Sequence, residues 1–372
     1  MKELLIDLKK ISSDGIKIKI NDIQNKYAVK FKLGGDLLFI ANMLGLKGGN
    51  ANYACPWCTA NLKEKTNVDR IYNPRSYEEA IRIISTSKKE DLGYVNKPII
   101  DFVNYDDITI DILHLLIRIS EKIFDCLIEK INNFDKNKYG DLEDRPVLKH
   151  FHDILTDTCK IRKPFTRVER ENNKIEIKMR SLNGNDYLKI FNTFEKDGGE
   201  VSNFFSKKII KKYLNKTEIE FEPLFPGFNL EKEDMVWSNF IQIYEVIRKY
   251  PDNTNLLNMN EFREKLKVWI RDFLLMRSGY AFPYAHALVW HIPDMLEKHE
   301  NINLFNQQGL EKLNDFIRIY FFRSTNKKRT KKEYLCQLLD KRNRIEFFSF
   351  KKDLQDLDYE ANILNEGPNL NE

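Results

Sequence analysis

The chain has 372 residues, 42% hydrophobic and 12% aromatic, which is enough for the core of one large or two modest domains. Its 25 Phe and 16 Tyr exclude an intrinsically disordered chain. No run approaches the roughly 18 apolar residues of a membrane helix, and the start lacks the apolar run of a signal peptide. We therefore expect an intracellular protein without a membrane partner, whose five cysteines form no disulfides.

The net charge of +5 is unevenly distributed along the chain. The last twenty residues, Asp353–Glu372, hold six acidic residues and no Lys or Arg, so the body is more basic than the total suggests. A basic body with an acidic tail suits a polyanionic partner. An ordinary Lys-rich solvated surface explains the same charge.

The first 50 residues predict a short mixed region. Apolar spacing predicts a helix over Met1–Ile11, and period-two alternation predicts strands over Gly15–Ile20 and Ala28–Leu33. Gly34 and Gly35 interrupt the second strand, and a helix over Leu37–Leu44 is expected to begin at Asp36. Because two strands alone do not make a stable sheet, we expect the chain to begin inside a domain.

Beyond residue 75 the patterns are almost all helical, so the expected fold class is α+β and predominantly helical. The expected helices cover 76–84, 108–132, 145–159, 184–195, 200–213, 236–249, 260–277, 284–299, 309–322 and 331–341. The acidic segment after Lys352 is expected to be a loose tail.

A Cys-x-x-Cys pair, Cys55 and Cys58, can supply two thiolates to a metal ion, and a tetrahedral site needs two further ligands. The candidates are His286 with His291, and His150 with His152. Residues five apart on an unbroken helix point roughly 140° apart, so the first pair needs a bend. Pro293 favours one just after His291. Two reduced thiols beside Trp57 are the plain alternative.

The segment FKLGGDLLFIANMLGLKGGNANYACPWC resembles the second catalytic aspartate region of the V(D)J recombination-activating recombinase and the related Transib-like transposases. In that family an Asp at a strand end precedes a Cys-x-x-Cys by 19 residues, as Asp36 precedes Cys55. A His-x4-His pair then precedes the catalytic Glu by 20 residues, as His291 precedes Glu311. Asp111-Ile-Leu-His114 and Arg180-Ser-Leu-Asn183-Gly184-Asn185 resemble further landmarks, and the match covers roughly residues 20–345.

The resemblance implies a partial RNase H-like (retroviral-integrase-like) core interrupted by a large helical insertion tied by zinc. The implied regions are 1–50 for the partial core, 51–300 for the zinc knuckle and helical insertion, 301–350 for the last catalytic-core helix and C-terminal helices, and 351–372 for the tail. The implied zinc ligands are Cys55, Cys58, His286 and His291. Asp36 and Glu311 are implied as carboxylate ligands of catalytic Mg²⁺ or Mn²⁺, with Asp315 a local competitor.

Structural roles explain the same acidic residues. Asp36 after two glycines is a good helix N-cap, and Glu311 near a helix start suits the positive end of the helix dipole. The family's first catalytic Asp lies well upstream of the second, and only 35 residues precede Asp36 here. We therefore expect this chain by itself not to be a competent recombinase. The alternative is a non-enzymatic, zinc-stabilised DNA- or protein-binding module domesticated from a transposase.

Basic clusters indicate contacts with the phosphates of double-stranded DNA. The candidates are Lys207, Lys208, Lys211 and Lys212 in one cluster, and Lys327, Lys328, Arg329, Lys331 and Lys332 in another, followed by Lys341, Arg342 and Arg344. The second cluster also resembles a nuclear localisation signal, so a nuclear protein is expected. Solvated surface faces are the alternative. Family members act as dimers, which implies a possible homodimer, and no small-molecule substrate is expected.

Overall fold

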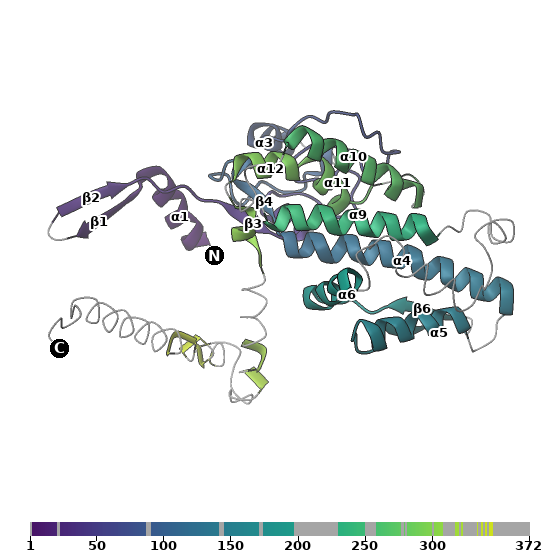
Figure 1. Cartoon of the computed structure of the whole chain (residues 1–372). Coiled ribbons are helices and arrows are strands. Elements are labelled where there is room, and N and C mark those ends of the chain that lie inside the picture. Colours follow the sequence, from purple (N-terminus) through teal and green to yellow (C-terminus); the bar gives the residue numbers. More distant parts are fainter. Residues whose placement is uncertain are drawn as a thin grey trace, which may run out of the picture. The chain divides into compact units, whose positions relative to one another are not determined.

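The computed structural model describes residues 2–20, 23–86, 91–140, 145–170, 174–196, 230–249, 258–276, 279, 281–299 and 301–307, with scattered positions between 317 and 344 (Figure 1). Met1–Asn306 form one compact unit and Gln307–Glu372 a second. The described elements are mostly helices with three two-stranded sheets, so the expected α+β, predominantly helical class is confirmed. None of the described helices is both long and apolar enough to cross a membrane.

The chain begins with helix α1 (Lys2–Asp14) and an antiparallel hairpin of β1 (Ile16–Ile20) and β2 (Ile23–Tyr27), which projects from the body of the first unit (Figure 1). The strand expected over Ala28–Leu33 is wrong, because residues 28–32 pair with no strand among the residues that the structure describes. Their alternation has another cause. Lys30 forms an ion pair with Asp107, and Lys32 lies beside His299.

A parallel pair of short strands, β3 (Leu33–Gly35) and β4 (Ile108–Ile110), brings two distant segments together. The sequence predicted one long helix from residue 108, but its first three residues form β4 and α4 (Ile112–Tyr139) follows. The β-branched residues of β4 are fully buried, and pairing with β3 overrides their helical spacing.

Helix α2 (Leu37–Met43) follows β3 directly, and α3 (Tyr77–Ser85) begins at Ser76, whose side chain accepts a hydrogen bond from the Glu79 amide. Between them runs the loop that carries Cys55 and Cys58. Gly45 has φ +70°, and a Cβ there would lie 2.1 Å from the carbonyl oxygen of Asn96. The loop therefore requires glycine at this position.

The long helix α4 is the centre of the helical body (Figure 1). It packs against α5 (Pro146–Asp153), α6 (Gly184–Lys196), α9 (Leu230–Lys249), α11 (Pro283–Trp290) and the strand β6 (Lys174–Met179). The remaining elements are β5 (Phe165–Arg170), α10 (Met259–Met276), α12 (Ile292–Lys298), a π-helical turn (Ile154–Thr158) and 3₁₀ turns at Asp91–Gly93, Tyr105–Asp107 and Ile302–Phe305. The hairpin of β5 and β6 was not predicted from the sequence.

Aromatic side chains fill the helical core. Phe124 of α4 packs edge-on against Trp237 of α9 with ring centroids 4.7 Å apart. Phe240 continues this cluster to Trp269 of α10, which stacks on Phe273. This packing fixes α10 and the following α11 against α4. The helices expected over 200–213, 309–322 and 331–341 lie wholly or largely outside the described residues.

Candidate metal centre

The loop that carries Cys55 and Cys58 is buried, and hydrogen bonds from the Arg75 side chain hold it in place. Both cysteines are 2% exposed, and the Arg75 side chain lies buried beneath them. Its guanidinium donates hydrogen bonds to the carbonyl oxygens of Cys55 (2.7 Å), Leu92 (2.8 Å) and Tyr53 (3.0 Å). Sequence reasoning missed this residue. Nothing in the local sequence marked Arg75 as structural, because an isolated Arg is ordinarily a surface residue.

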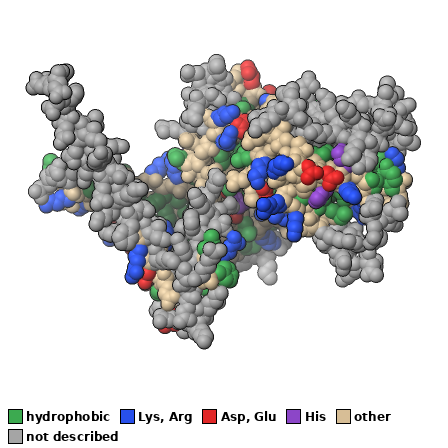
Figure 2. All heavy atoms as spheres, turned by 60° about the horizontal axis from the view of Figure 1, so that its bottom comes forward, with side chains coloured by type: hydrophobic (Ala, Val, Ile, Leu, Met, Phe, Trp, Pro, Cys, Tyr) green, Lys and Arg blue, Asp and Glu red, His purple; other side chains and the backbone are tan. Residues whose placement is uncertain are grey.

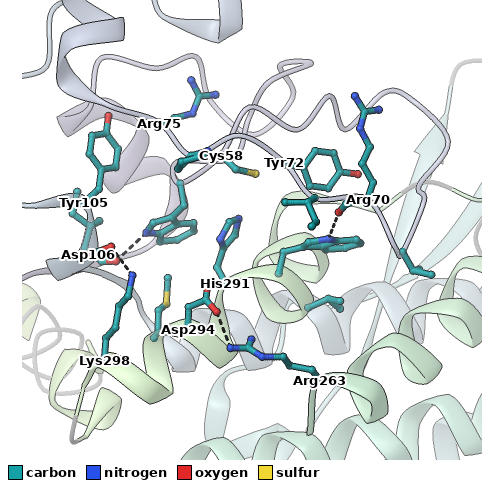
Figure 3. A pocket seen from close by; sticks show the side chains of 18 of the residues that line it. Cys58, Arg70, Tyr72, Arg75, Tyr105, Asp106, Arg263, His291, Asp294 and Lys298 are labelled. Carbon is teal, nitrogen blue, oxygen red and sulfur yellow. Dashed lines mark hydrogen bonds and ion pairs between the residues drawn. The ribbon is translucent and has the colours of Figure 1, made fainter. Parts of the chain in front are cut away.

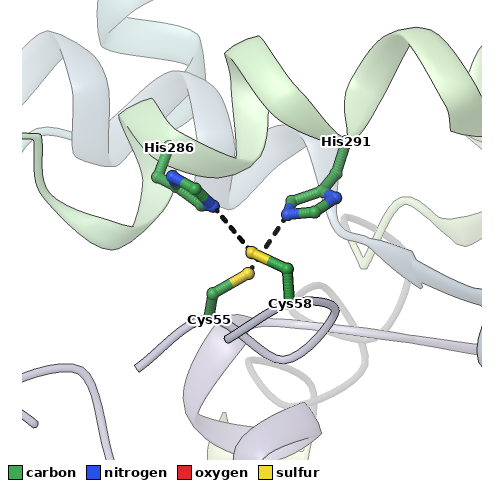
Figure 4. A group of neighbouring side chains, drawn as sticks. All are labelled: Cys55, Cys58, His286 and His291. Atoms are coloured by element: carbon green, nitrogen blue, oxygen red, sulfur yellow. Dashed lines mark hydrogen bonds between the residues drawn. The ribbon is translucent and has the colours of Figure 1, made fainter. Parts of the chain in front are cut away.

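The two histidines come from a helix that breaks between them. His286 lies within α11, and His291 stands at the junction with α12, where its φ of −124° and ψ of −31° depart from helical geometry. Pro293 lies in the first turn of α12. The bend expected near His291 is present, and it turns both imidazoles toward the cysteines (Figure 4).

The four side chains enclose one point. The Cys58 Sγ lies 3.2 Å from His286 Nε2, and the Cys55 Sγ lies 3.2 Å from His291 Nε2. All four ligand atoms lie within 4.8 Å of one another. In a tetrahedral site with metal–sulfur bonds of about 2.3 Å and metal–nitrogen bonds of about 2.0 Å, sulfur and nitrogen lie about 3.5 Å apart. The donor set therefore fits a closed, four-coordinate metal site and is consistent with structural zinc.

The protonation states of these groups suit metal binding. Burial opposes ionisation of Cys55, but a hydrogen bond from Cys58 and the nearby imidazoles outweigh it and hold the Cys55 pKa well below the usual value. The hydrogen bond to Cys55, followed by burial, raises the pKa of Cys58. Burial lowers the pKa of His286 and favours the neutral imidazole that a metal requires.

An aromatic shell surrounds the four side chains. Trp290 stacks on His286 with ring centroids 4.7 Å apart, and the Trp57 ring lies 5.4 Å from that of His291. The Trp57 indole N–H donates to the carbonyl oxygen of Ile108 in β4 at 2.9 Å. The site therefore joins the cysteine loop, the α11–α12 junction and the strand pair.

A cavity of about 490 Å³ lies beside this centre, with Cys58, His291, Trp57 and Trp290 among its lining residues (Figure 3). Two of its cations form ion pairs with acidic residues of the lining. Arg263 contacts Asp294 at 2.9 Å, and Lys298 contacts Asp106 at 2.6 Å. Arg75, which also lines the cavity, is bound to backbone carbonyl oxygens instead.

The sequence left two roles open for Asp36, a helix N-cap and a metal ligand, and the structure shows the first. It follows β3 directly and is half-buried, and its Oδ1 accepts a hydrogen bond of 2.6 Å from the Phe39 amide as the N-cap of α2. Its other carboxylate oxygen accepts no hydrogen bond from the residues that the structure describes. One oxygen therefore caps the helix and the other is available for a ligand.

A second carboxylate lies at the same edge of the strand pair. Asp111 follows β4 as Asp36 follows β3, and its amide donates to the carbonyl oxygen of Gly35 at 2.9 Å. Its side chain is fully buried, caps α4 through the Leu113 amide and pairs with His114. The sequence marked Asp111 only as part of a resemblance, because its position at a strand end depends on β3.

The other expected site residues divide into three groups. His150 and His152 lie on α5 and take no part in the four-residue cluster. Outside the described residues lie Glu311 with its competitor Asp315, and the expected phosphate contacts Lys207, Lys208, Lys211, Lys212, Lys327, Lys328, Arg329, Lys331, Lys332 and Lys341. Arg342 and Arg344 are described as helical, and nothing places them beside DNA.

Comparison with known proteins adds no relative, because no family model and no curated protein sequence matches this chain.

Proposed function

We propose that this chain is the zinc-tied part of the catalytic core of a transposase-type DNA recombinase, similar to the V(D)J and Transib-like group, and that it binds double-stranded DNA in the nucleus. The observation that carries the proposal is the closure of Cys58 onto His286 across 228 residues, together with Cys55 and His291. This is the pairing that the resemblance requires, and Cys-x-x-Cys spacing by itself did not select it.

Zinc is the metal that this donor set favours. Two thiolates and two imidazoles in a tetrahedral arrangement suit Zn²⁺, and four protein ligands leave no position for water or substrate. The ion would therefore be structural. It would hold the helical segment 51–300 closed upon the strand pair, so that the two ends of that segment stay together.

The strand pair supports a partial RNase H-like core. β3 and β4 are parallel, and in open parallel sheets ligands bind beyond the carboxyl ends of the strands. Asp36 lies at that end with one oxygen available. When bound, Mg²⁺ or Mn²⁺ would activate the attacking hydroxyl and stabilise the leaving oxygen during strand cleavage. Asp36 and Glu311 would be two of the three carboxylates that hold the ions.

Charge is consistent with a polyanionic partner. On the face shown in Figure 2, Lys and Arg side chains outnumber acidic ones over the described surface. Phosphate contacts supply most non-specific DNA affinity, so such a surface suits duplex binding without base recognition.

One observation favours the second candidate, a zinc-stabilised DNA- or protein-binding module without catalysis. Asp36 is an N-cap, and among the described residues it belongs to no cluster of three or more possible metal ligands. A capping role is sufficient to explain the residue.

Two measurements test these proposals. Electrophoretic mobility shifts should show that the wild-type chain binds a short duplex, and absence of binding would overturn DNA binding altogether. Paramagnetic resonance of added Mn²⁺ should show binding that falls in Asp36→Asn and in Glu311→Gln. Mn²⁺ binding unchanged in both variants would favour the non-catalytic module.

Plasmid nicking completes the test. Because a two-metal site uses more carboxylates than Asp36 and Glu311 provide, we expect these two residues alone to support no Mg²⁺-dependent nicking. Nicking that disappears in both carboxylate variants would show that this chain completes its own catalytic set, against our expectation.

A further inference from the structure

The hairpin of β1 and β2 has two chemically different faces. Paired residues of an antiparallel ladder lie on the same side, and successive residues alternate between sides. One face therefore carries the register pairs Ile16–Tyr27, Ile18–Asn25 and Ile20–Ile23, and the other carries Lys17–Lys26 and Lys19–Gln24. All of β2 is exposed. The hairpin therefore presents a basic face to solvent.

The basic face brings like charges together. Lys17 lies directly opposite Lys26, where side chains of an antiparallel pair approach to about 5 Å, and Lys19 lies two residues along the same strand. Opposed like charges destabilise a sheet. Among the described residues, neither Lys17 nor Lys26 forms an ion pair. An anion bound over this face would relieve the repulsion.

The basic character continues toward the strand pair. The sequence from Gly15 to Gly35 contains five Lys and one acidic residue. β2 ends at Tyr27 and β3 begins at Leu33, so only residues 28–32 separate the hairpin from the strand that precedes Asp36. A long polyanion bound to the hairpin would therefore also lie near the end of β3.

On the basis of the function proposed above, we propose that the basic face of this hairpin, Lys17, Lys19, Gln24 and Lys26, is a binding surface for duplex DNA. A two-stranded ribbon fits the major groove, which is about 12 Å wide. The lysines would contact phosphates and set the affinity without base recognition.

An anionic membrane surface is the competing partner, and the arrangement of side chains disfavours it. Interfacial membrane elements bury apolar residues while their cations meet the headgroups. Here Ile16, Ile18 and Ile23 lie on the side of the ribbon opposite the lysines. Burying the isoleucines in lipid would turn Lys17 and Lys26 away from the headgroups.

The test compares two double variants that lose the same charge. Lys17→Gln/Lys26→Gln removes the opposed pair and should leave the hairpin at least as stable, because it removes a repulsion. Lys97→Gln/Lys149→Gln removes two exposed lysines from other parts of the first unit and is the matched control. Thermal unfolding followed by circular dichroism checks that both variants fold as the wild type does.

The readout is the salt dependence of duplex binding. Each lost phosphate contact reduces the slope of log K against log salt by about 0.9, so the hairpin variant should lose about 1.8 and the control should lose nothing. Equal slopes in wild type and hairpin variant, with wild type still binding DNA, would overturn this surface alone. If the wild type binds no duplex, the function proposed above fails as well.

Vesicles containing phosphatidylserine form the second arm. We expect no binding that depends on Lys17 and Lys26. Vesicle binding lost in the hairpin variant, with an unchanged DNA slope, would assign the surface to membranes and refute the DNA proposal.

Discussion

Replacing His291 with Ala is the sharpest test of the metal centre. The ion would join Cys55 to His291 and close a loop of 236 residues. By the chain-entropy relation used for cross-links, closing a loop of that length stabilises the folded state by about 5 kcal/mol. Whole domains are stable by only about 5–15 kcal/mol, so loss of the ion should remove a large share of the stability.

The expected result has two parts. Elemental mass spectrometry of the gel-filtered wild type should give about one zinc per chain, and His291→Ala and Cys55→Ser should each lose it. The melting temperature should fall by roughly 6 °C, because 1 kcal/mol corresponds to only about 1.3 °C when the unfolding entropy is about 2.1 cal/mol/K for each of 372 residues. A chelator added to the wild type should reproduce the shift.

His152→Ala is the matched control, because this histidine is part-exposed on α5 and lies outside the cluster. It should retain zinc and the wild-type melting temperature. A metal-free wild type, or zinc retained in full by His291→Ala, would refute the shared site. The recombinase proposal would then lose its main support.

Three further predictions concern the frame around the site. Arg75→Met should destabilise the fold by about 3 kcal/mol or more in urea unfolding and weaken zinc binding, because three buried carbonyl groups lose their donor. A loss of stability below about 1 kcal/mol would contradict this role of Arg75. Gly45→Ala should lower the free energy of unfolding several times more than Gly140→Ala does. Both glycines have positive φ, but of the two only Gly45 would place a Cβ against backbone atoms. Equal losses of stability would refute this steric explanation. Burial, followed by nearby Lys32, lowers the pKa of His299, so the unfolded state binds more protons and stability should fall as pH drops below about 6.5. His299→Gln should flatten that dependence in urea titrations at successive pH values, and an identical dependence would exclude His299 as its source.

Local pattern and covalent geometry were enough to predict much of the chain. The Cys-x-x-Cys loop, the N-cap at Asp36 and the bend near His291 depend on residues within one turn of the backbone. The long amphipathic helices were predicted equally well, because apolar residues recur on one face over several turns. The ranges of most described helices differ from the expected ones by a few residues at their ends.

Strands were predicted less well, since a strand exists only through its partner. Residues 28–32 alternate as a strand does but find no ladder, whereas Ile108–Ile110 continue a helical pattern and form β4 because β3 lies beside them. The position of Asp111 at the same edge as Asp36 follows from that pairing and from no local signal.

The ligand set of the metal centre divides in the same way. The sequence by itself predicted that Cys55 and Cys58 can supply two thiolates to a metal ion, with two reduced thiols as the alternative, and that the chain bends near His291. Spacing left His150 and His152 as competitors, and only a family resemblance favoured His286 and His291. Tertiary structure alone brings the latter pair to the cysteines, because the packing of α9 and α11 on α4 closes a chain of more than two hundred residues. Contact over that distance is decided by how the whole core packs, which no local pattern encodes.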